Sequence, residues 1–223
     1  MTCQNTLSWY ELIPVFSFVG LLGRCRNCRS KISWQYPLVE IITGLIFLGV
    51  FLKFQNLFFL DTLSFAFTYA FYTVTLSLLL VIAVYDIRHK IIPDPLSFML
   101  GLLAFIGLFF FNEFGLFPHW PSVMEFLSGP ILALPFALFW LVSRGKWMGL
   151  GDAKLVIGLG WLLGLSRALS GIVAGFWIGA AVGLFLVVFR RKKYGMKSEL
   201  PFAPYLVLGA ALAFLLELHL FGI

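Results

Sequence analysis

Long apolar stretches separated by short polar segments dominate this chain. About 20 helical residues cross the hydrocarbon core of a bilayer, and six stretches come close to that length or exceed it. They are Pro37–Phe54, Thr62–Tyr85, Pro95–Phe111, Ser122–Ser143, Ala168–Phe189 and Ala203–Phe221. The length of a seventh, Ala153–Leu165, does not decide whether it crosses. The pattern predicts an all-α fold, a polytopic integral membrane helical bundle.

The positions of Lys and Arg decide the seventh stretch, because cytosolic loops carry an excess of these residues. All of the 16 basic residues except Lys53 and Arg167 fall in four loops. These loops hold Arg24, Arg26, Arg29 and Lys31; Arg88 and Lys90; Arg144, Lys146 and Lys154; and Arg190, Arg191, Lys192, Lys193 and Lys197. They share one side of the membrane only if Ala153–Leu165 crosses. We therefore expect about seven transmembrane helices, with the N-terminal segment in the cytosol and the C-terminus outside.

The composition agrees with a membrane protein and argues against nucleic-acid binding. Hydrophobic residues make up 61% of the 223 positions and charged residues only 12%, far from the values of an ordinary soluble domain. The net charge of +6 is spread over membrane-flanking loops and forms no compact basic domain. We expect the lipid bilayer as a partner and no nucleic acid; the sequence does not determine the oligomeric state.

The N-terminal segment, residues 1–36, is the only sizeable region outside the predicted membrane domain, 37–223. It contains all three cysteines, Cys3, Cys25 and Cys28. The Cys25-x-x-Cys28 spacing allows two thiolates to bind one metal ion from a tight turn, and a cytosolic location favours metal over a disulfide. Three cysteines leave a tetrahedral zinc site one ligand short, so ordinary thiols remain the alternative to zinc.

Two aspartates stand at the predicted cytosolic ends of membrane helices. Asp86 ends the stretch Thr62–Tyr85, and Asp152 follows the glycines of Gly149-Leu150-Gly151. An ionised carboxylate is expensive in an apolar helix, so such residues usually serve a function or pair with a cation. Asp94, in Pro93-Asp94-Pro95, has a structural explanation as the N-cap of the next helix, with Pro95 at its first position.

Two carboxylates on the same face suit the hydrolysis of a peptide bond. When they share one proton, one deprotonates a water molecule while the other protonates the scissile carbonyl oxygen. Gly149 and Gly151 allow a tight turn and a close approach of the substrate backbone, which a Cβ would obstruct. The simpler alternatives are an ion pair of Asp86 with Arg88 or Lys90, and Asp152 as the N-cap of a helix.

A glycine occurs every four residues along the sixth long stretch, at Gly171, Gly175, Gly179 and Gly183. This repeat makes one side of the helix nearly flat, which favours close helix packing. We expect the packing to lie within the bundle; a dimer interface is the alternative. For Glu40, just inside the first stretch, we expect an ion pair with Arg24, Arg29 or Lys31.

Five sequence segments together resemble type IV prepilin peptidases, bacterial members of the GxGD membrane aspartyl proteases. They are Cys25-x-x-Cys28; Ile32-Ser33-Trp34-Gln35-Tyr36-Pro37-Leu38-Val39-Glu40; Asp86-Ile87-Arg88-His89-Lys90-Ile91-Ile92-Pro93-Asp94; Gly149-Leu150-Gly151-Asp152-Ala153-Lys154; and Pro201-Phe202-Ala203-Pro204-Tyr205. The resemblance runs from Cys3 to about Tyr205, nearly the whole chain.

The resemblance implies an endopeptidase of the bacterial inner membrane that cleaves the basic leader of prepilins and pseudopilins at the cytosolic face. Asp86 and Asp152 would be its catalytic pair, with Gly149, Gly151 and Lys154 supporting the loop and the substrate backbone. No cofactor is needed for hydrolysis. Many members also methylate the new N-terminal amine with S-adenosylmethionine and hold zinc through two CxxC pairs.

The chain departs from this pattern at its start. The residues after Cys3 look like those after the family's second cysteine, so the first cysteine would fall before Met1, and an initial membrane helix is also absent. We expect either a truncated N-terminus or a shortened member whose metal site has three thiolates or is vacant. Zinc binding by Cys3, Cys25 and Cys28, and methyl transfer, are therefore open questions at this point.

Two rival functions differ in testable ways. A small transporter or ion carrier would also use membrane acids, but its ion sites lie near the bilayer midplane on discontinuous helices, whereas Asp86 and Asp152 lie at one edge. A methyltransferase or assembly factor without proteolysis would need an intact first loop.

Overall fold

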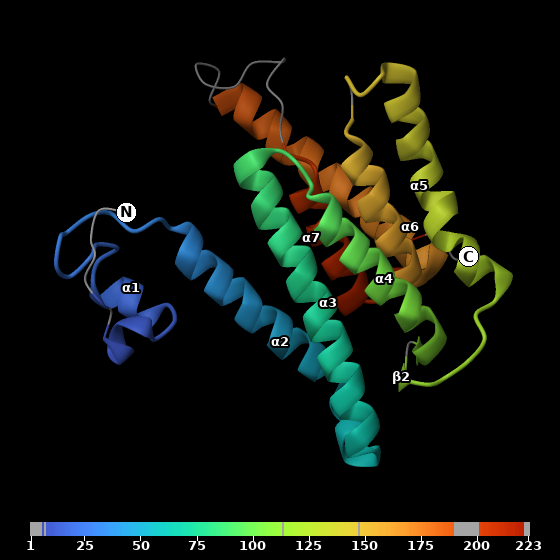
Figure 1. Cartoon of the computed structure of the whole chain (residues 1–223), viewed down its shortest axis with the longest axis horizontal. Coiled ribbons are helices and arrows are strands. Elements are labelled where there is room, and N and C mark those ends of the chain that lie inside the picture. The colour runs from blue at the N-terminus through green and yellow to red at the C-terminus, as the bar shows by residue number, and fades with distance from the viewer. Residues whose placement is uncertain (1–5, 7, 113, 147, 190–200, 221–223) are drawn as a thin grey trace. The chain divides into compact units, whose positions relative to one another are not determined.

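The computed structural model describes residues 6, 8–112, 114–146, 148–189 and 201–220 (Figure 1). The chain forms two compact units, which divide between residues 49 and 50, within the long helix α2 (Gln35–Leu60). This division does not test the predicted boundary between residues 1–36 and 37–223, which stays a prediction.

The second unit is a bundle of apolar helices. After the end of α2 it contains α3 (Thr62–His89), α4 (Asp94–Phe110), α5 (Val123–Ser143), α6 (Leu150–Phe189) and α7 (Ala203–Leu215). Polar residues mark where helices begin. The side chain of Asp61 accepts the backbone N–H of Leu63 at the start of α3, and Ser122 and Glu125 form a reciprocal capping box at the start of α5.

The helix α6 is two helices joined at Gly164, whose backbone angles of φ 74° and ψ 170° are not helical. Glycine permits this conformation because it has no Cβ. The first half begins beside Ile92, whereas the second half approaches Tyr205, near the start of α7, as it proceeds. The chain therefore reverses at Gly164, and Ala153–Leu165 and Ala168–Phe189 run in opposite directions, as expected for two successive spans.

Three glycines of the repeat in α6, Gly171, Gly175 and Gly179, pack inside the bundle, as predicted. A Cβ on Gly171 would lie 3.0 Å from the backbone of Ala210, and one on Gly175 would lie 2.7 Å from the carbonyl oxygen of Tyr205. Gly179 faces the ring of Tyr205. These glycines let α6 and α7 approach almost to backbone contact, which is how small residues stabilise helix pairs in membranes.

The prediction of an all-α membrane bundle is confirmed. Each of the seven predicted spans contains a helix. Among the described residues, four helices (α2, α3, α5 and α6) are long and apolar enough to cross a membrane, while α4 and α7 are apolar but shorter. A short antiparallel hairpin of β1 (Phe111–Asn112) and β2 (Gly115–Leu116), which the sequence pattern did not predict, follows α4.

One end of the second unit collects the segments that matter for the site, and we call it the aspartate end. It consists of the last turn of α3 with Asp86, the loop to α4, the start of α6 with Asp152, and the start of α7. Glu217 belongs to the opposite end, beyond α7, where it forms a 2.7 Å ion pair with Lys53. The helices thus separate the acids into two groups.

The first unit is small and contains a 3₁₀ turn, η1 (Trp9–Leu12), a short helix, α1 (Phe16–Gly20), and the beginning of α2. Phe18 is buried in it and its ring lies 4.8 Å from that of Trp34. Glu40 accepts the backbone N–H of Val15 at 2.7 Å. This hydrogen bond gives Glu40 a backbone partner where the sequence had suggested a basic side chain.

The close contact of α6 with α7 predicts that Gly175→Ala destabilises the protein. The added Cβ meets the backbone of α7, which cannot move away as a side chain could, and such overpacking costs about 1–3 kcal/mol. Thermal unfolding in detergent measures the effect. Gly101→Ala is the matched control, since nothing lies within 4 Å of its added Cβ, and it should leave the midpoint unchanged or raise it. Equal midpoints for the two variants would contradict this packing.

Candidate active site

Asp86 lies in the last turn of α3, where two features oppose a charge. Its side chain is only 5% exposed, and the C-terminal end of a helix carries a partial negative charge. The start of α7 compensates for both: the backbone N–H of Ala203, the first residue of α7, donates a hydrogen bond to Asp86 Oδ2 at 3.1 Å. Because a backbone N–H can only donate, this oxygen of Asp86 is held as an acceptor.

Asp152 is the third residue of α6 and is 9% exposed. It lies at the helix N-terminus, where unpaired N–H groups favour a negative charge. Its carboxyl group lies within electrostatic range of that of Asp86. The structure therefore brings the two predicted aspartates to the same end of the bundle, both buried: Asp152 lies in the first turn of α6, and Asp86 accepts a hydrogen bond from the start of α7.

The loop between α3 and α4 connects the segment that carries Asp86 to the start of α6, which carries Asp152. Asp94 forms a 2.6 Å ion pair with Lys154 of α6, and Ile92, which is buried, packs on Gly151. Asp94 is itself the first residue of α4 and Pro93 is its N-cap, so the predicted cap position was wrong by one residue. Lys154 supports the loop, and its partner is Asp94.

The two glycines of Gly149-Leu150-Gly151 have different neighbours. A Cβ on Gly149 would meet nothing closer than 3.8 Å, and the nearest atom is Oδ2 of Asp152. A Cβ on Gly151 would lie 2.9 Å from Cβ of Ile92, closer than real Cβ contacts. A side chain at residue 149 would therefore have room beside the Asp152 carboxylate, whereas the space at residue 151 is already occupied by Ile92.

This arrangement suits acid–base chemistry without a metal ligand or a nucleophilic side chain. Two buried carboxylates whose charges interact cannot both ionise without cost, which favours a state in which the pair holds one proton. Such a pair offers a base for water and an acid for a carbonyl oxygen at the same time.

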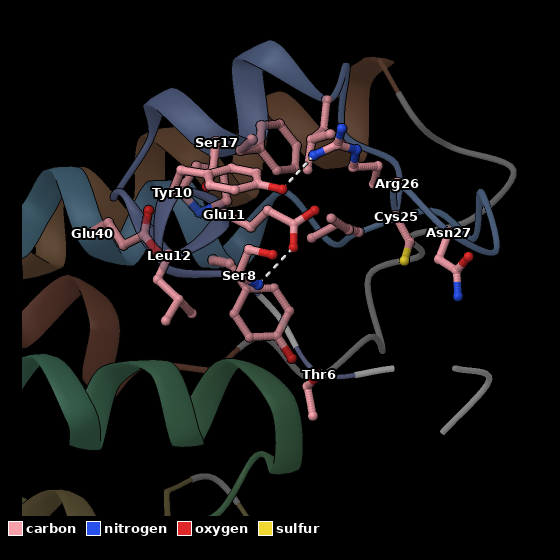
Figure 2. A pocket seen from close by; sticks show the side chains of 15 residues that line it. Thr6, Ser8, Tyr10, Glu11, Leu12, Ser17, Cys25, Arg26, Asn27 and Glu40 are labelled. Atoms are coloured by element: carbon pink, nitrogen blue, oxygen red, sulfur yellow. Dashed lines mark hydrogen bonds between the residues drawn. The ribbon is translucent and has the colours of Figure 1, made fainter. Parts of the chain in front are cut away.

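A separate pocket of about 820 Å³ lies in the first unit (Figure 2). Its polar lining includes two acids, Glu11 and Glu40, and the pair of Arg26 and Tyr10, joined by a 2.6 Å hydrogen bond from the guanidinium to the phenol oxygen. The size is within the range of small-molecule sites, about 300–1,000 Å³. Two carboxylates at its wall favour a ligand that carries a positive charge.

The cysteine motif forms a tight turn next to this pocket. An antiparallel backbone β-bridge between Arg24 and Lys31 closes the turn, and Cys25 lines the pocket. Cys25 and Cys28 are not in a disulfide, and two thiolates at this spacing would supply half of a tetrahedral zinc site. Cys3 lies outside the described residues. Within the described part of the chain, no three of His, Cys, Asp and Glu gather as a metal site would require.

Sequence reasoning missed two residues that contact the aspartates or their neighbours, Ala203 and Ile92. Ala203 acts through its backbone, which has no residue signature, although the prolines at 201 and 204 mark the start of a helix. Ile92 looks like any loop hydrophobe, and only its contact with Gly151 reveals its position. The pocket of the first unit also escaped notice, since its lining comes from four separate segments.

Comparisons with known proteins identify the family of the chain. Residues 1–54 match the Bacterial Peptidase A24 N-terminal domain, and residues 73–184 match the Type IV leader peptidase family. The chain is 33% identical over 227 residues to the prepilin leader peptidase/N-methyltransferase of Stutzerimonas stutzeri, covering 96% of this chain and 69% of that protein. It is 31% identical over 214 residues to the protein of that name from Bacillus subtilis, covering 96% and 79%. No solved structure matches the chain.

The hydrogen bond from Ala203 predicts that removing its N–H destabilises the fold. Ala203→Pro, which has no N–H, leaves the buried Asp86 oxygen without this donor and should lower the free energy of unfolding by about 1–3 kcal/mol. Chemical unfolding in mixed micelles measures it, with Ala203→Gly, which keeps the N–H, as the control. Proline also restricts Phe202, whose backbone is α-helical.

An amide-to-ester replacement at residue 203 removes the N–H without that restriction and should give the same loss. An ester variant as stable as the parent would show that this hydrogen bond does not hold Asp86.

Proposed function

Because the chain belongs to the type IV leader peptidase family, we propose that it is an aspartic endopeptidase of the bacterial inner membrane that removes the basic leader of type IV prepilins or pseudopilins. The observation that carries the proposal is the pair of Asp86 and Asp152, both buried at one end of a membrane bundle, where the charge of Asp86 acts on Asp152. Among the described residues, neither aspartate forms an ion pair that would explain its burial, and the nearby Asp94–Lys154 pair engages a different acid.

In the proposed reaction, one carboxylate of the pair takes a proton from water and the other, protonated, gives its proton to the scissile carbonyl oxygen. The hydroxide adds to the carbonyl carbon and gives a tetrahedral diol. Collapse of the diol breaks the C–N bond: the leaving nitrogen takes up the proton that the first carboxylate had received, and one hydroxyl of the diol returns its proton to the second carboxylate as the new carboxyl group forms. The pair again holds one proton, so the cycle closes without a cofactor.

We propose that the aspartate end faces the cytosol. Arg88, Lys90 and Lys154 lie in the segments that form this end, and Arg144 and Lys146 lie in the loop that leads into the start of α6. Cytosolic loops concentrate Lys and Arg. A basic leader held in the cytosol by the same rule would meet the pair there. The substrate's apolar helix would stay in the membrane while its leader unwinds to reach the aspartates.

N-methylation of the new N-terminus is a second proposed activity, supported by the pocket of the first unit and by the names of the relatives. S-adenosylmethionine, when bound, would supply the methyl group. Glu11 and Glu40 fit such a ligand because they provide negative charge for a sulfonium or an ammonium group. Zinc, if held by Cys25 and Cys28, would stiffen the turn that carries Arg26.

The peptidase proposal predicts that Asp86→Asn and Asp152→Asn each abolish leader removal. Each change removes one proton-transfer group, and such groups contribute about 100- to 10,000-fold. Mass spectrometry of a prepilin peptide incubated with purified protein measures cleavage. Asp61→Asn, which changes an acid at the opposite end of α3, is the control and should cleave normally. Full cleavage by either catalytic variant would refute the mechanism.

The methylation proposal predicts a separation of the two activities. Glu40→Gln keeps an oxygen acceptor for Val15 but loses the charge, so leader removal should continue while the added mass of one methyl group disappears. The same spectra report both products when S-adenosylmethionine is supplied. Loss of cleavage together with methylation would instead indicate that Glu40 only maintains the fold.

A further inference from the structure

We propose that Ile92 is a positioning residue for the peptidase reaction, which, packed against Gly151, sets the placement of Asp86 relative to Asp152. The inference rests on the proposed function, since it concerns the same pair of aspartates. It assigns a task to a loop residue that has no reactive group, and it gives Gly151 a different task from the approach of the substrate backbone that the sequence suggested.

The contact joins the two chain segments that carry the aspartates. Ile92 follows Asp86 in the loop that leaves α3, and Gly151 directly precedes Asp152 in α6. Ile92 is only 8% exposed. A Cβ on residue 151 would lie 2.9, 3.4 and 3.5 Å from three carbons of Ile92, with Cβ the nearest. The loop therefore lies directly against the α6 backbone, at a distance that only glycine allows.

The neighbouring ion pair is weaker as a fastener. Asp94 and Lys154 meet at 2.6 Å, but their side chains are 74% and 40% exposed. Exposed ion pairs contribute about 0–1 kcal/mol, whereas burial of an isoleucine side chain contributes about 1.5–3 kcal/mol. The burial of Ile92 therefore contributes more free energy at this contact than the exposed ion pair does.

This contact gives the two glycines of the motif separate tasks. Gly149 leaves open space beside Asp152 Oδ2, which a substrate backbone can enter. Gly151 admits Ile92 and thereby brings the end of α3 to the start of α6. A change at Gly149 should then act on substrate binding, and a change at Gly151 on the rate of the chemical step. Small misplacements of reacting groups, of about 1 Å, can cost about 100-fold in rate.

Ordinary helix packing is the competing explanation, and the chain contains a matched case. A Cβ on Gly158, two turns further along α6, would lie 2.9 Å from Cγ of Leu100 in α4. The overlap equals that at Gly151, but neither Gly158 nor Leu100 adjoins an aspartate. If Gly151 only serves packing, Gly151→Ala and Gly158→Ala should behave alike.

A double-mutant cycle tests the proposal. Gly151→Ala and Ile92→Gly, each alone, should lower kcat for a prepilin peptide by about 10- to 100-fold with little change in KM. Glycine is needed at residue 92 because the clash is with Cβ. In the double variant residue 151 gains a Cβ and residue 92 loses its own, so the two no longer clash. Its kcat should therefore be no lower than that of the worse single variant. Gly158→Ala should lower the unfolding temperature but keep kcat.

The outcomes separate the two claims. Losses that multiply in the double variant, as for independent sites, or an equal loss of kcat in Gly158→Ala, would overturn the positioning role. Asp152→Asn, measured in the same assay, tests the proposed function by itself. If Asp152→Asn is inactive and the losses multiply, the peptidase function stands but Ile92 has no positioning role. An Asp152→Asn variant as active as the parent would remove the peptidase mechanism.

Discussion

The burial of two carboxylates in an apolar bundle is the constraint around which this structure is built. A charge far from water must be compensated by donors or by the partial charges of the backbone. Asp86 ends its own helix, so its compensation comes from another: the N–H of Ala203 at the start of α7. Asp152 lies in the first turn of α6. The bundle thus directs two helix N-termini at one small region.

Close backbone packing makes that convergence possible. Glycines at 171 and 175 bring α6 against α7, which carries Ala203, and Gly158 and Gly160 bring α6 against α4 and α5. Gly164 allows α6 to reverse, so one stretch of chain both presents Asp152 and packs on the helix that binds Asp86. The glycines far from the aspartates therefore belong to the same construction as the glycines of the motif.

Much of this could be predicted from the sequence because the membrane imposes strong rules. Apolar length located the helices, and the basic loops required Ala153–Leu165 to cross, which the reversal at Gly164 supports. The glycine repeat indicated internal packing, and Asp86 and Asp152 stood out as acids in an apolar context. Roles carried by backbone atoms or by shape, as at Ala203 and Ile92, were not visible, because neither an N–H group nor a contact distance appears in a sequence pattern. The β1–β2 hairpin and the partner of Glu40 also depend on tertiary contacts.

The central claim, that Asp86 and Asp152 act on one water molecule, is tested most directly by the affinity for a transition-state mimic. A prepilin peptide with a hydroxyl-bearing tetrahedral carbon at the scissile position should bind about 100-fold more tightly than the substrate peptide, or better. Either Asp86→Asn or Asp152→Asn should remove that advantage while the affinity for the substrate peptide stays the same. If the mimic keeps its advantage in either variant, the two carboxylates do not share the reacting centre.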